Sequence, residues 1–237
     1  MIDLEEFYIL GEPIETEIGV CEFLKVKEYP DYFSDLQLFS WSKEEIVYHY
    51  HKINENNIMD ELIEEIKQNS LFEIITSIPE FNTAYSKIFS KVFNDESILP
   101  KFNEDNFCYY RKLVMRMNGI KEEEINPNPE IQEWVEKSKR VKSQNQDEIH
   151  FSDIISSVVV YAGRSYEEVR NWSLLQLYHS FHRIGYFKNY DTSTLFSTVS
   201  SDKIDIKSWG THIDLFENEK HVITRDELAK KKKVFDE

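Results

Sequence analysis

The sequence predicts a mainly α-helical protein with a small β element at its N-terminus. Helix-start signals recur along the chain from residue 42 onward, and apolar residues return at intervals of three and four. Only 6 glycines and 6 prolines occur in 237 residues, so few positions interrupt regular structure. The apolar fraction of 41% is sufficient for a substantial core.

The N-terminal segment has the clearest β character. Two short β-prone runs, residues 7–10 and 19–26, are separated by the turn-forming triplet Gly11-Glu12-Pro13. The sequence therefore predicts that these two runs form a small hairpin or two strands.

Helical patterns begin at Tyr29. Ser42 with Glu45 and Ser70 with Glu73 match the capping box, in which a side-chain oxygen and a carboxylate satisfy backbone N–H groups of the first turn. Two further helices are expected, one from Pro79 to Asn94 and one closing on Asn118-Gly119. The apolar positions expected to be buried in the longest of these helices are Phe81, Ala84, Tyr85, Ile88, Phe89 and Val92.

A polar stretch, KSKRVKSQNQDE, divides the chain. A helix is expected to begin at Pro129 and to grade into this stretch, where Val141 is the one apolar residue. The stretch is either a long exposed end of that helix or a linker between two modules. We therefore predict an N-terminal module (residues 1–140), a polar linker (137–148) and a C-terminal helical module (149–237).

The C-terminal module is expected to hold three capped helices. Ser152 and Asp153 can cap the first, and Gly163 can end it. The second and third are predicted from the capping boxes at residues 165–168 and 173–176, with a joint near Asn171.

Gly185 is expected to end the third of these helices. Residues 202–209, DKIDIKSW, alternate in polarity as an extended edge or a strand would. A last helix is predicted from Thr224 and Glu227.

The charge and the cysteines of the chain limit which partners and which cellular compartment we expect. The formal net charge of -16 disfavours non-specific binding to the phosphates of a nucleic acid. No apolar run approaches the length of a membrane span, and the N-terminus lacks the pattern of a signal peptide. Cys21 and Cys108 lie in apolar or aromatic surroundings, and we expect two buried free thiols in a reducing compartment.

Two histidines raise the question of an enzyme. His179 and His182 are three residues apart, but a zinc site needs a third and a fourth ligand that the neighbourhood does not supply. We expect His182 to lie beside the apolar stripe of its helix and His179 to point toward water. The carboxylate pairs fall in first turns or on polar faces of helices, and no phosphate-binding or nucleophile motif occurs. The prediction is no enzyme, no catalytic residue, no metal and no cofactor.

Residues 152–185 also have the rhythm of a helix-turn-helix unit. Its second element begins with acidic residues, Glu167 and Glu168, where a DNA-reading helix needs basic or amide side chains. DNA recognition is therefore the weaker interpretation.

Aromatic side chains are the strongest remaining signal. The C-terminal module has more of them than its own core needs, which favours exposed binding anchors, although burial of all of them is an equal alternative. The residues predicted to bind a protein partner are Trp172, Tyr178, Phe181, Tyr186, Phe187 and Trp209, with Tyr190 and Phe196 beside them.

Four short patterns give the chain a family resemblance. Residues 165–169 match S-[YF]-E-E-V and residues 171–177 match N-x-[ST]-L-x-Q-L. Nearer the N-terminus, residues 11–19 read G-x-P-I-x-T-x-I-G and residues 23–29 read F-L-x-V-x-E-Y. In these patterns, the sequence resembles tail assembly chaperones of tailed bacteriophages.

The resemblance implies an acidic, mostly helical protein of the host cytoplasm. Such a chaperone would bind the long helical tape-measure protein, cover its apolar stripes and present tail tube subunits to it. Two alternatives remain open. One is a structural subunit of a phage tail, baseplate or neck, which would be found in the virion, and the other is a hydrolase that uses His179 or His182.

Overall fold

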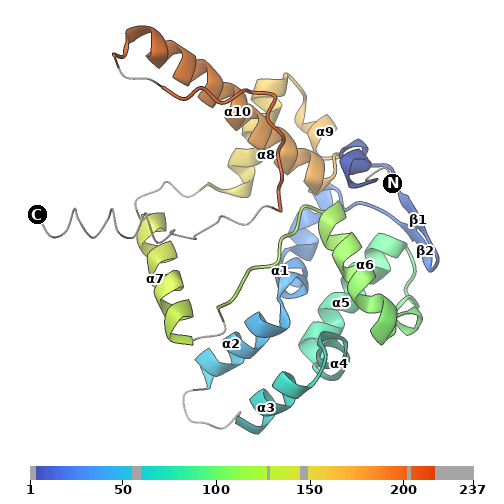
Figure 1. Ribbon diagram of the computed structural model, residues 1–237. Coiled ribbons are helices and arrows are strands. Elements are labelled where there is room, and N and C mark those ends of the chain that lie inside the picture. Colours follow the sequence, from blue (N-terminus) through green and yellow to red (C-terminus); the bar gives the residue numbers. More distant parts are fainter. Residues whose placement is uncertain (1–3, 55–59, 127–128, 145–148, 202–203, 217–237) are drawn as a thin grey trace, which may run out of the picture.

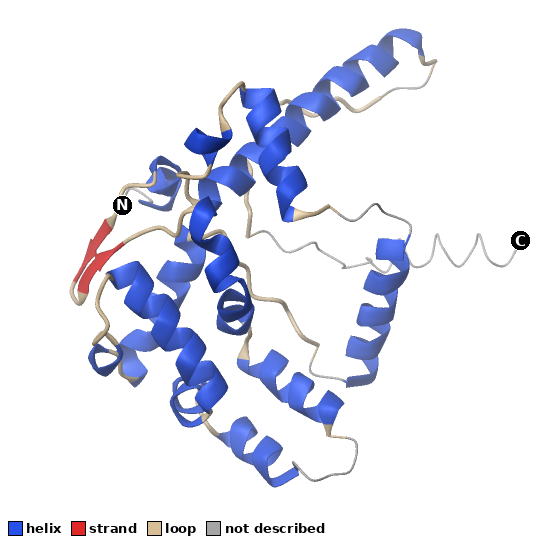
Figure 2. Ribbon diagram, turned by 180° about the vertical axis from the view of Figure 1, so that it is seen from behind, coloured by secondary structure: helices blue, strands red, loops and turns tan. Residues whose placement is uncertain are grey.

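The chain is mostly helical, as the sequence predicts. The computed structural model describes residues 4–54, 60–126, 129–144, 149–201 and 204–216, and in these ranges it forms ten α-helices and one two-stranded sheet. Figure 1 and Figure 2 show the helices gathered into one body from which part of the last helix projects. No helix in the described ranges is long and apolar enough to cross a lipid bilayer.

The hairpin lies later in the sequence than predicted. Residues Leu4–Leu10 form a 3₁₀-helix (η1), and the two strands are β1 (Ile14–Thr16) and β2 (Gly19–Cys21), paired antiparallel. The predicted first strand was wrong because residues 7–10 pack as a helical turn, with the ring of Tyr8 6.1 Å from that of Phe23. Gly11, at φ +72°, turns the chain out of η1 toward β1.

The helices of the N-terminal half follow the predicted order. A short 3₁₀-helix, η2 (Val26–Glu28), leads into α1 (Tyr29–Ser40), α2 (Lys43–Ile53), α3 (Asp60–Gln68) and α4 (Leu71–Ser77). The side-chain oxygens of Ser42 and Ser70 accept hydrogen bonds from the N–H groups of Glu45 and Glu73, so both predicted helix starts are confirmed.

α5 (Pro79–Phe93) lies at the centre of this half, packed against α1 and α4. All six of its predicted apolar positions are buried, and Asn94 ends it in the left-handed conformation at φ 49°. Another 3₁₀-helix, η3 (Leu99–Lys101), precedes α6 (Glu104–Met117), which Asn118 and Gly119 end as expected.

Aromatic rings fill much of the main core. Phe89 lies between Phe39 and Phe102, with ring centroids 5.3 and 4.2 Å away, and Tyr85 lies 4.3 Å from Phe39 and 5.7 Å from Phe107. Rings in such contacts bury large apolar areas and add edge-to-face or stacking attraction. The high aromatic content of the N-terminal half is therefore used internally.

The predicted polar linker is helical over its described part. α7 (Pro129–Gln144) includes residues 137–144, and residues 145–148 lie outside the described ranges. α7 is linked to α2 by an ion pair between Lys52 and Glu136, with a nitrogen–oxygen distance of 3.0 Å.

The C-terminal half begins with two capped helices. α8 (Phe151–Ala162) starts earlier than predicted. The carboxylate of Asp153 accepts from the N–H of His150, so the cap residue is His150, which lies two residues before Ser152. Gly163 ends α8 at φ +62°, and the box of Ser165 with Glu168 starts α9 (Tyr166–Val169).

The last described helix, α10 (Leu174–Val199), is longer than predicted. It starts at the box of Ser173 with Gln176, as expected, but it runs through Gly185 and continues for fourteen more residues. Gly185 was the wrong stop signal because it keeps helical geometry and does not take the left-handed conformation that ends a helix. We call residues 186–199 the arm, and Figure 1 shows it projecting from the body.

Residues 204–216, which we call the strap, run back along α10 toward the end of α6 (Figure 1). The predicted edge strand is not formed by residues 204–209, which have no regular structure. The predicted helix at Thr224 and Glu227 lies outside the described ranges.

The two halves share hydrogen bonds and a core. The N–H groups of Val26 and Lys27 donate to the carbonyls of Trp172 and Arg170, at 2.9 and 3.0 Å. Leu174 and Leu175 belong to the main core of the N-terminal half, and Val26 belongs to the smaller core of the C-terminal half. Residues 24–27 therefore contact both halves of the chain, through these hydrogen bonds and through the two cores.

The cysteines differ in environment. Cys21 is buried as predicted, but Cys108 is exposed. The prediction for Cys108 was wrong because Phe107, Tyr110 and Arg111 belong to the buried face of α6, whereas Cys108 lies on its exposed side.

Candidate partner-binding surface

α10 carries the predicted surface, and its two ends lie in different environments. At the N-terminal end, Leu174, Leu175 and Leu177 are buried between the two cores. Beyond Gly185 no side chain of the helix is fully buried. One continuous helix therefore joins the packed body to the arm.

Three of the predicted anchors are part of the body. Trp172 and Phe181 pack, partly buried, against the smaller core around Val158, Val169 and Leu177. Tyr178 packs against the main core, its ring 6.4 Å from Phe151, and burial raises the pKa of its phenol. These three side chains stabilise the body with most of their surface.

Of the other three predicted anchors, Phe187 and Trp209 meet where the strap crosses α10, and Tyr186 precedes Phe187 on the helix. The ring of Phe187 stacks on Trp209 at 5.4 Å and on Tyr161 of α8 at 6.4 Å. The guanidinium of Arg183 lies 5.7 Å from the ring of Tyr186. Trp209 retains 49% of its surface exposed, so this cluster is covered on one side and open on the other.

The predicted set is therefore divided between two places. Trp172, Tyr178 and Phe181 lie at the junction with the body, and Tyr186, Phe187 and Trp209 lie at the base of the arm.

The most exposed apolar side chains of α10 lie further out on the arm. Leu195, Phe196 and Val199 are 67%, 57% and 77% exposed. Their spacing places them within one third of the helix circumference, on one face. Phe196 was predicted from the sequence, but Leu195 and Val199 were not, because the helix was expected to end at Gly185. The 195–199 spacing was the signal that would have found them.

A shallow cavity of about 430 Å³ opens beside the junction. Gly185 lines it, and a Cβ atom placed on that glycine would meet nothing within 4 Å. Phe181, Ile184 and Tyr186 supply apolar lining, and Lys207 of the strap supplies a charge at its edge. A bulky apolar side chain of a partner would fit such an opening.

The two histidines of α10 do not share a site. His179 is half-buried and lines a cavity with Arg183 and His212, whereas His182 is exposed and lines the cavity beside Gly185. The prediction that His179 points toward water was wrong, because the strap covers the side of α10 on which it lies. His182 lies beside the apolar stripe as expected, with its ring 6.1 Å from that of Phe181. Burial lowers the pKa of both rings, and the charges of Arg183 and His212 lower that of His179 further. Among the described residues, no group of three or more His, Cys, Asp or Glu side chains could hold a metal ion.

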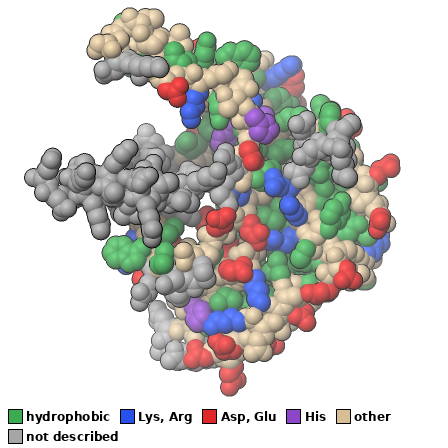
Figure 3. All heavy atoms as spheres, in the orientation of Figure 1, with side chains coloured by type: hydrophobic (Ala, Val, Ile, Leu, Met, Phe, Trp, Pro, Cys, Tyr) green, Lys and Arg blue, Asp and Glu red, His purple; other side chains and the backbone are tan. Residues whose placement is uncertain are grey.

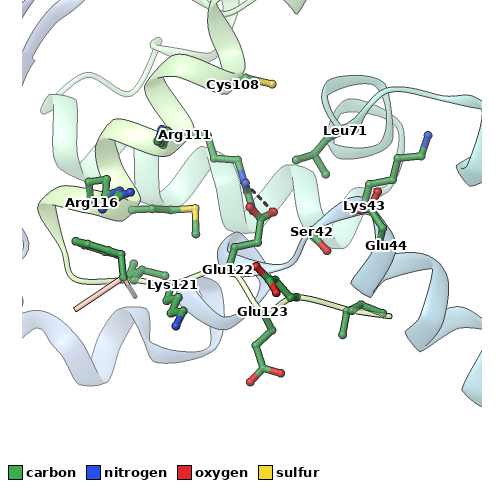
Figure 4. Close-up of a pocket in the computed structure, with 16 residues that line it drawn as sticks. Ser42, Lys43, Glu44, Leu71, Cys108, Arg111, Arg116, Lys121, Glu122 and Glu123 are labelled. Atoms are coloured by element: carbon green, nitrogen blue, oxygen red, sulfur yellow. Dashed lines mark hydrogen bonds and ion pairs between the residues drawn. The ribbon is translucent and has the colours of Figure 1, made fainter. Parts of the chain in front are cut away.

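A cavity of about 790 Å³ lies between α2, α6 and the segment 120–125 (Figure 4). Its most buried charged group is Arg111, which is 7% exposed. Its guanidinium donates to the carbonyls of Phe39, Ser40 and Trp41 at the end of α1, and Nη1 pairs with Glu122 at 3.2 Å.

Arg111 also contacts Tyr85, whose hydroxyl accepts a bond from Nε at 2.9 Å. Burial raises the pKa of Tyr85 to about 12, so the phenol stays protonated at neutral pH. Although burial opposes the charge on Arg111, Tyr85 and Glu122 hold its pKa above the ordinary value. The donors of this arginine are thus engaged in holding α1 against α5 and α6.

Comparisons with known proteins give two family matches. A model described as the YomV N-terminal domain matches residues 2–127, and one described as the YomV second domain matches residues 142–214. The "SPbeta prophage-derived uncharacterized protein YomV" of Bacillus subtilis (strain 168) is 38% identical over 228 residues, which cover 95% of this chain and 96% of the relative. No solved structure matches this chain.

Proposed function

Since the chain belongs to the YomV family, with a prophage-derived relative, we propose that this protein is a non-enzymatic phage tail morphogenesis protein. In this role it is an assembly chaperone that binds the helical tape-measure protein, tail subunits, or both, in the host cytoplasm.

The observation that carries the proposal is the apolar face of the arm. Leu195, Phe196 and Val199 belong to neither core, and more than half of the surface of each side chain is exposed. Exposed apolar side chains grouped on one helix face mark a contact surface for another protein.

The composition of the arm suits an apolar helical partner. Residues 189–199 carry one charge, that of Asp191, in a chain whose net charge is -16. Few charged groups would therefore lose hydration when a helix packs against the arm. The acidic body would meanwhile keep the complex soluble while the apolar stripe of the partner is covered.

The arrangement of the polar groups supports a binding role over a hydrolase. His179 and His182 line separate cavities and share no substrate position. The buried Arg111 donates hydrogen bonds to the carbonyls at the end of α1, which is a structural role.

The test is co-purification with the tape-measure protein of the same prophage, expressed in the same cells. The wild-type chain and the variant Ser197→Asp should retain the tape-measure protein, whereas Phe196→Asp should lose most of it. Both substitutions add one carboxylate to the arm at adjacent positions, but Ser197 lies about 100° further round the helix from Phe196. Equal retention by the two variants would contradict the proposal.

Mass spectrometry of purified phage particles separates the chaperone from the structural alternative. A chaperone is expected to be absent from the particles. Detection of the chain at fixed stoichiometry would instead identify it as a subunit of the tail, baseplate or neck.

A further inference from the structure

The cavity beside Gly185 and the apolar face of the arm lie on the same side of α10. An α-helix turns by about 100° and rises by about 1.5 Å with each residue. Phe196 comes eleven residues after Gly185, so it points within about 20° of the same direction, about 17 Å further along the axis. Val199 lies about 40° to the other side of that direction. We call this side of α10, from Gly185 to Val199, the long face.

The two ends of the long face differ in shape. At Gly185 the surface is hollow, because the glycine has no side chain and a Cβ atom there would meet nothing within 4 Å. At the other end Phe196 and Val199 project, with 57% and 77% of their surface exposed. A partner that covers both ends needs a large apolar side chain for the cavity and an apolar surface for the arm.

The charges next to the long face are positive. Lys188 follows the cavity along α10, about 60° from the direction of Gly185, and Lys207 of the strap lines the cavity. The ammonium of Lys188 lies 5.2 Å from the centre of the ring of Tyr161, a contact that leaves its charge in place. A carboxylate of a partner is therefore favoured near these two lysines.

Acidic side chains of this chain lie mostly elsewhere. Asp191 is the one carboxylate in residues 181–199, and it points about 120° away from the direction of Gly185. Figure 3 shows hydrophobic side chains (green) along α10 at the top of the view and acidic side chains (red) mainly on the lower part of the body. The long face thus differs in charge from the rest of a chain whose net charge is -16.

We propose that the long face binds an amphipathic helix of the tape-measure protein through two apolar anchors about eleven residues apart. The first anchor, a large side chain such as Phe, Leu or Met, enters the cavity beside Gly185. The second anchor lies on Phe196 and Val199, and a carboxylate between the two anchors faces Lys188. This inference rests on the proposed function and adds the chemistry that the bound segment must have.

A helix suits the long face because it repeats the same geometry. Residues that are eleven positions apart in the bound helix also lie within about 20° of one direction and about 17 Å apart. Two helices that cross at about 20° stay in contact over several turns. An extended segment covers that distance in about five residues and turns alternate side chains away from the surface.

A second copy of the chain fits the long face less well. It would present Lys188 again and supply no carboxylate from its own long face. It would also bring together two bodies that each belong to a chain of net charge -16.

The experiment is a competition between wild type and variant, both as full chains with different tags, for the tape-measure protein of the same prophage in the same cells. The tape-measure protein is captured through its own tag, and the ratio of variant to wild type is compared between eluate and lysate. Gly185→Leu fills the cavity and should be depleted about tenfold or more.

Gly185→Ala is the matched control, because its methyl group meets nothing within 4 Å and leaves most of the cavity open. It should compete equally with the wild type. Leucine and alanine both favour a helix more than glycine does, and circular dichroism should show that both variants are folded.

The charge is tested in the same competition. Lys188→Glu should be depleted about fivefold or more, because it places a carboxylate opposite that of the partner. Lys112→Glu changes the net charge equally on the exposed side of α6 and should compete as the wild type does. Equal depletion of the two variants would refute the contact between Lys188 and a carboxylate.

The spacing of the anchors is tested by photo-crosslinking. A photoreactive side chain replaces Asn189, which lines the cavity, in one sample and Val199 in another, and mass spectrometry locates the cross-links. The two positions should lie about ten residues apart in one segment of the tape-measure protein. Cross-links in separate segments would refute a single bound helix, and cross-links to a second copy of the chain would identify that copy as the occupant.

The outcomes separate this inference from the proposed function. If capture of the tape-measure protein recovers no wild-type chain, the proposed function fails and the inference fails with it. If the wild type is recovered and Phe196→Asp is depleted but Gly185→Leu competes equally, the arm binds the partner and the role of the cavity alone is refuted.

Discussion

The side-chain oxygen of Asn118 accepts a hydrogen bond from the backbone N–H of Leu24, with a nitrogen–oxygen distance of 2.9 Å. The amide nitrogen of Asn118 donates in turn to the carbonyl of Val114, and the residue is 1% exposed. The carbonyl of Leu24 accepts from the N–H of Leu174, at the start of α10. A continuous set of bonds thus runs from α6 through residue 24 to α10 and couples the two halves of the chain.

Asn118→Leu should lower the free energy of unfolding by about 1–3 kcal/mol, because it leaves the buried N–H of Leu24 without an acceptor. Urea denaturation monitored by circular dichroism measures this loss. Asn189→Leu is the control, since Asn189 lies exposed on α10, and it should change stability by less than about 0.5 kcal/mol. A loss no larger than that of the control would show that water satisfies the N–H group of Leu24.

Arg111→Met should destabilise the protein by about 3 kcal/mol, because the carbonyls of Phe39, Ser40 and Trp41 lose a charged donor in a buried site. Arg111→Lys should fall between this variant and the wild type, since an ammonium keeps the charge but cannot reproduce the planar set of donors. Denaturation in urea ranks the variants, with the exposed neighbour Lys112→Met as the control. Equal losses for Met and Lys would indicate that the planar set of donors, and not the charge, is required.

The local signals of the sequence predicted local structure well. Ser70, Ser165 and Ser173 cap their helices with the residues three positions on, because a capping box involves only one turn of chain. The six apolar positions of α5 are buried because periodicity reports the face that a helix turns to the core.

What the sequence could not predict depends on distant residues. The bond between Asn118 and Leu24 spans 94 positions, and no local pattern indicates it. Gly185 was predicted to end its helix because glycine is common just after helix ends. A glycine has this effect where the chain takes the left-handed conformation, as Gly163 does at φ +62°. That error hid the arm, and with it the apolar face of Leu195 and Val199.

Stability should fall as the pH is lowered from 7.5 to 5.5. The folded pKa values of His179 and His182 lie below their ordinary value of 6.5, so the unfolded chain binds more protons in this range. Their contribution is fully present above the unfolded pKa and is lost as the pH falls toward the folded pKa. The double variant His179→Gln and His182→Gln should have a shallower pH dependence in thermal unfolding, measured in phosphate-free buffer. An unchanged slope would assign the effect to other groups.

Ile213→Ser should release the strap while the body stays folded. Ile213 is the one buried apolar side chain of the strap, at 7% exposure, and its full burial contributes about 1.5–3 kcal/mol. Hydrogen–deuterium exchange should therefore become about tenfold faster or more in residues 204–216, where the N–H of Thr211 donates to the carbonyl of Ser208.

Peptides from α5 should exchange at the wild-type rate in the same sample, because that helix is buried in the main core and packs chiefly against α1 and α4. Ile206→Ser is the matched control, since Ile206 belongs to the same strap but is 37% exposed and should leave its exchange nearly unchanged. Faster exchange in both the strap and α5 of the Ile213 variant would show that the strap is an integral part of the fold. Faster exchange confined to the strap and the adjoining turns of α10 would show that the strap opens as a unit, since Arg183 then loses the carbonyls of Trp209 and Thr211 to which it donates.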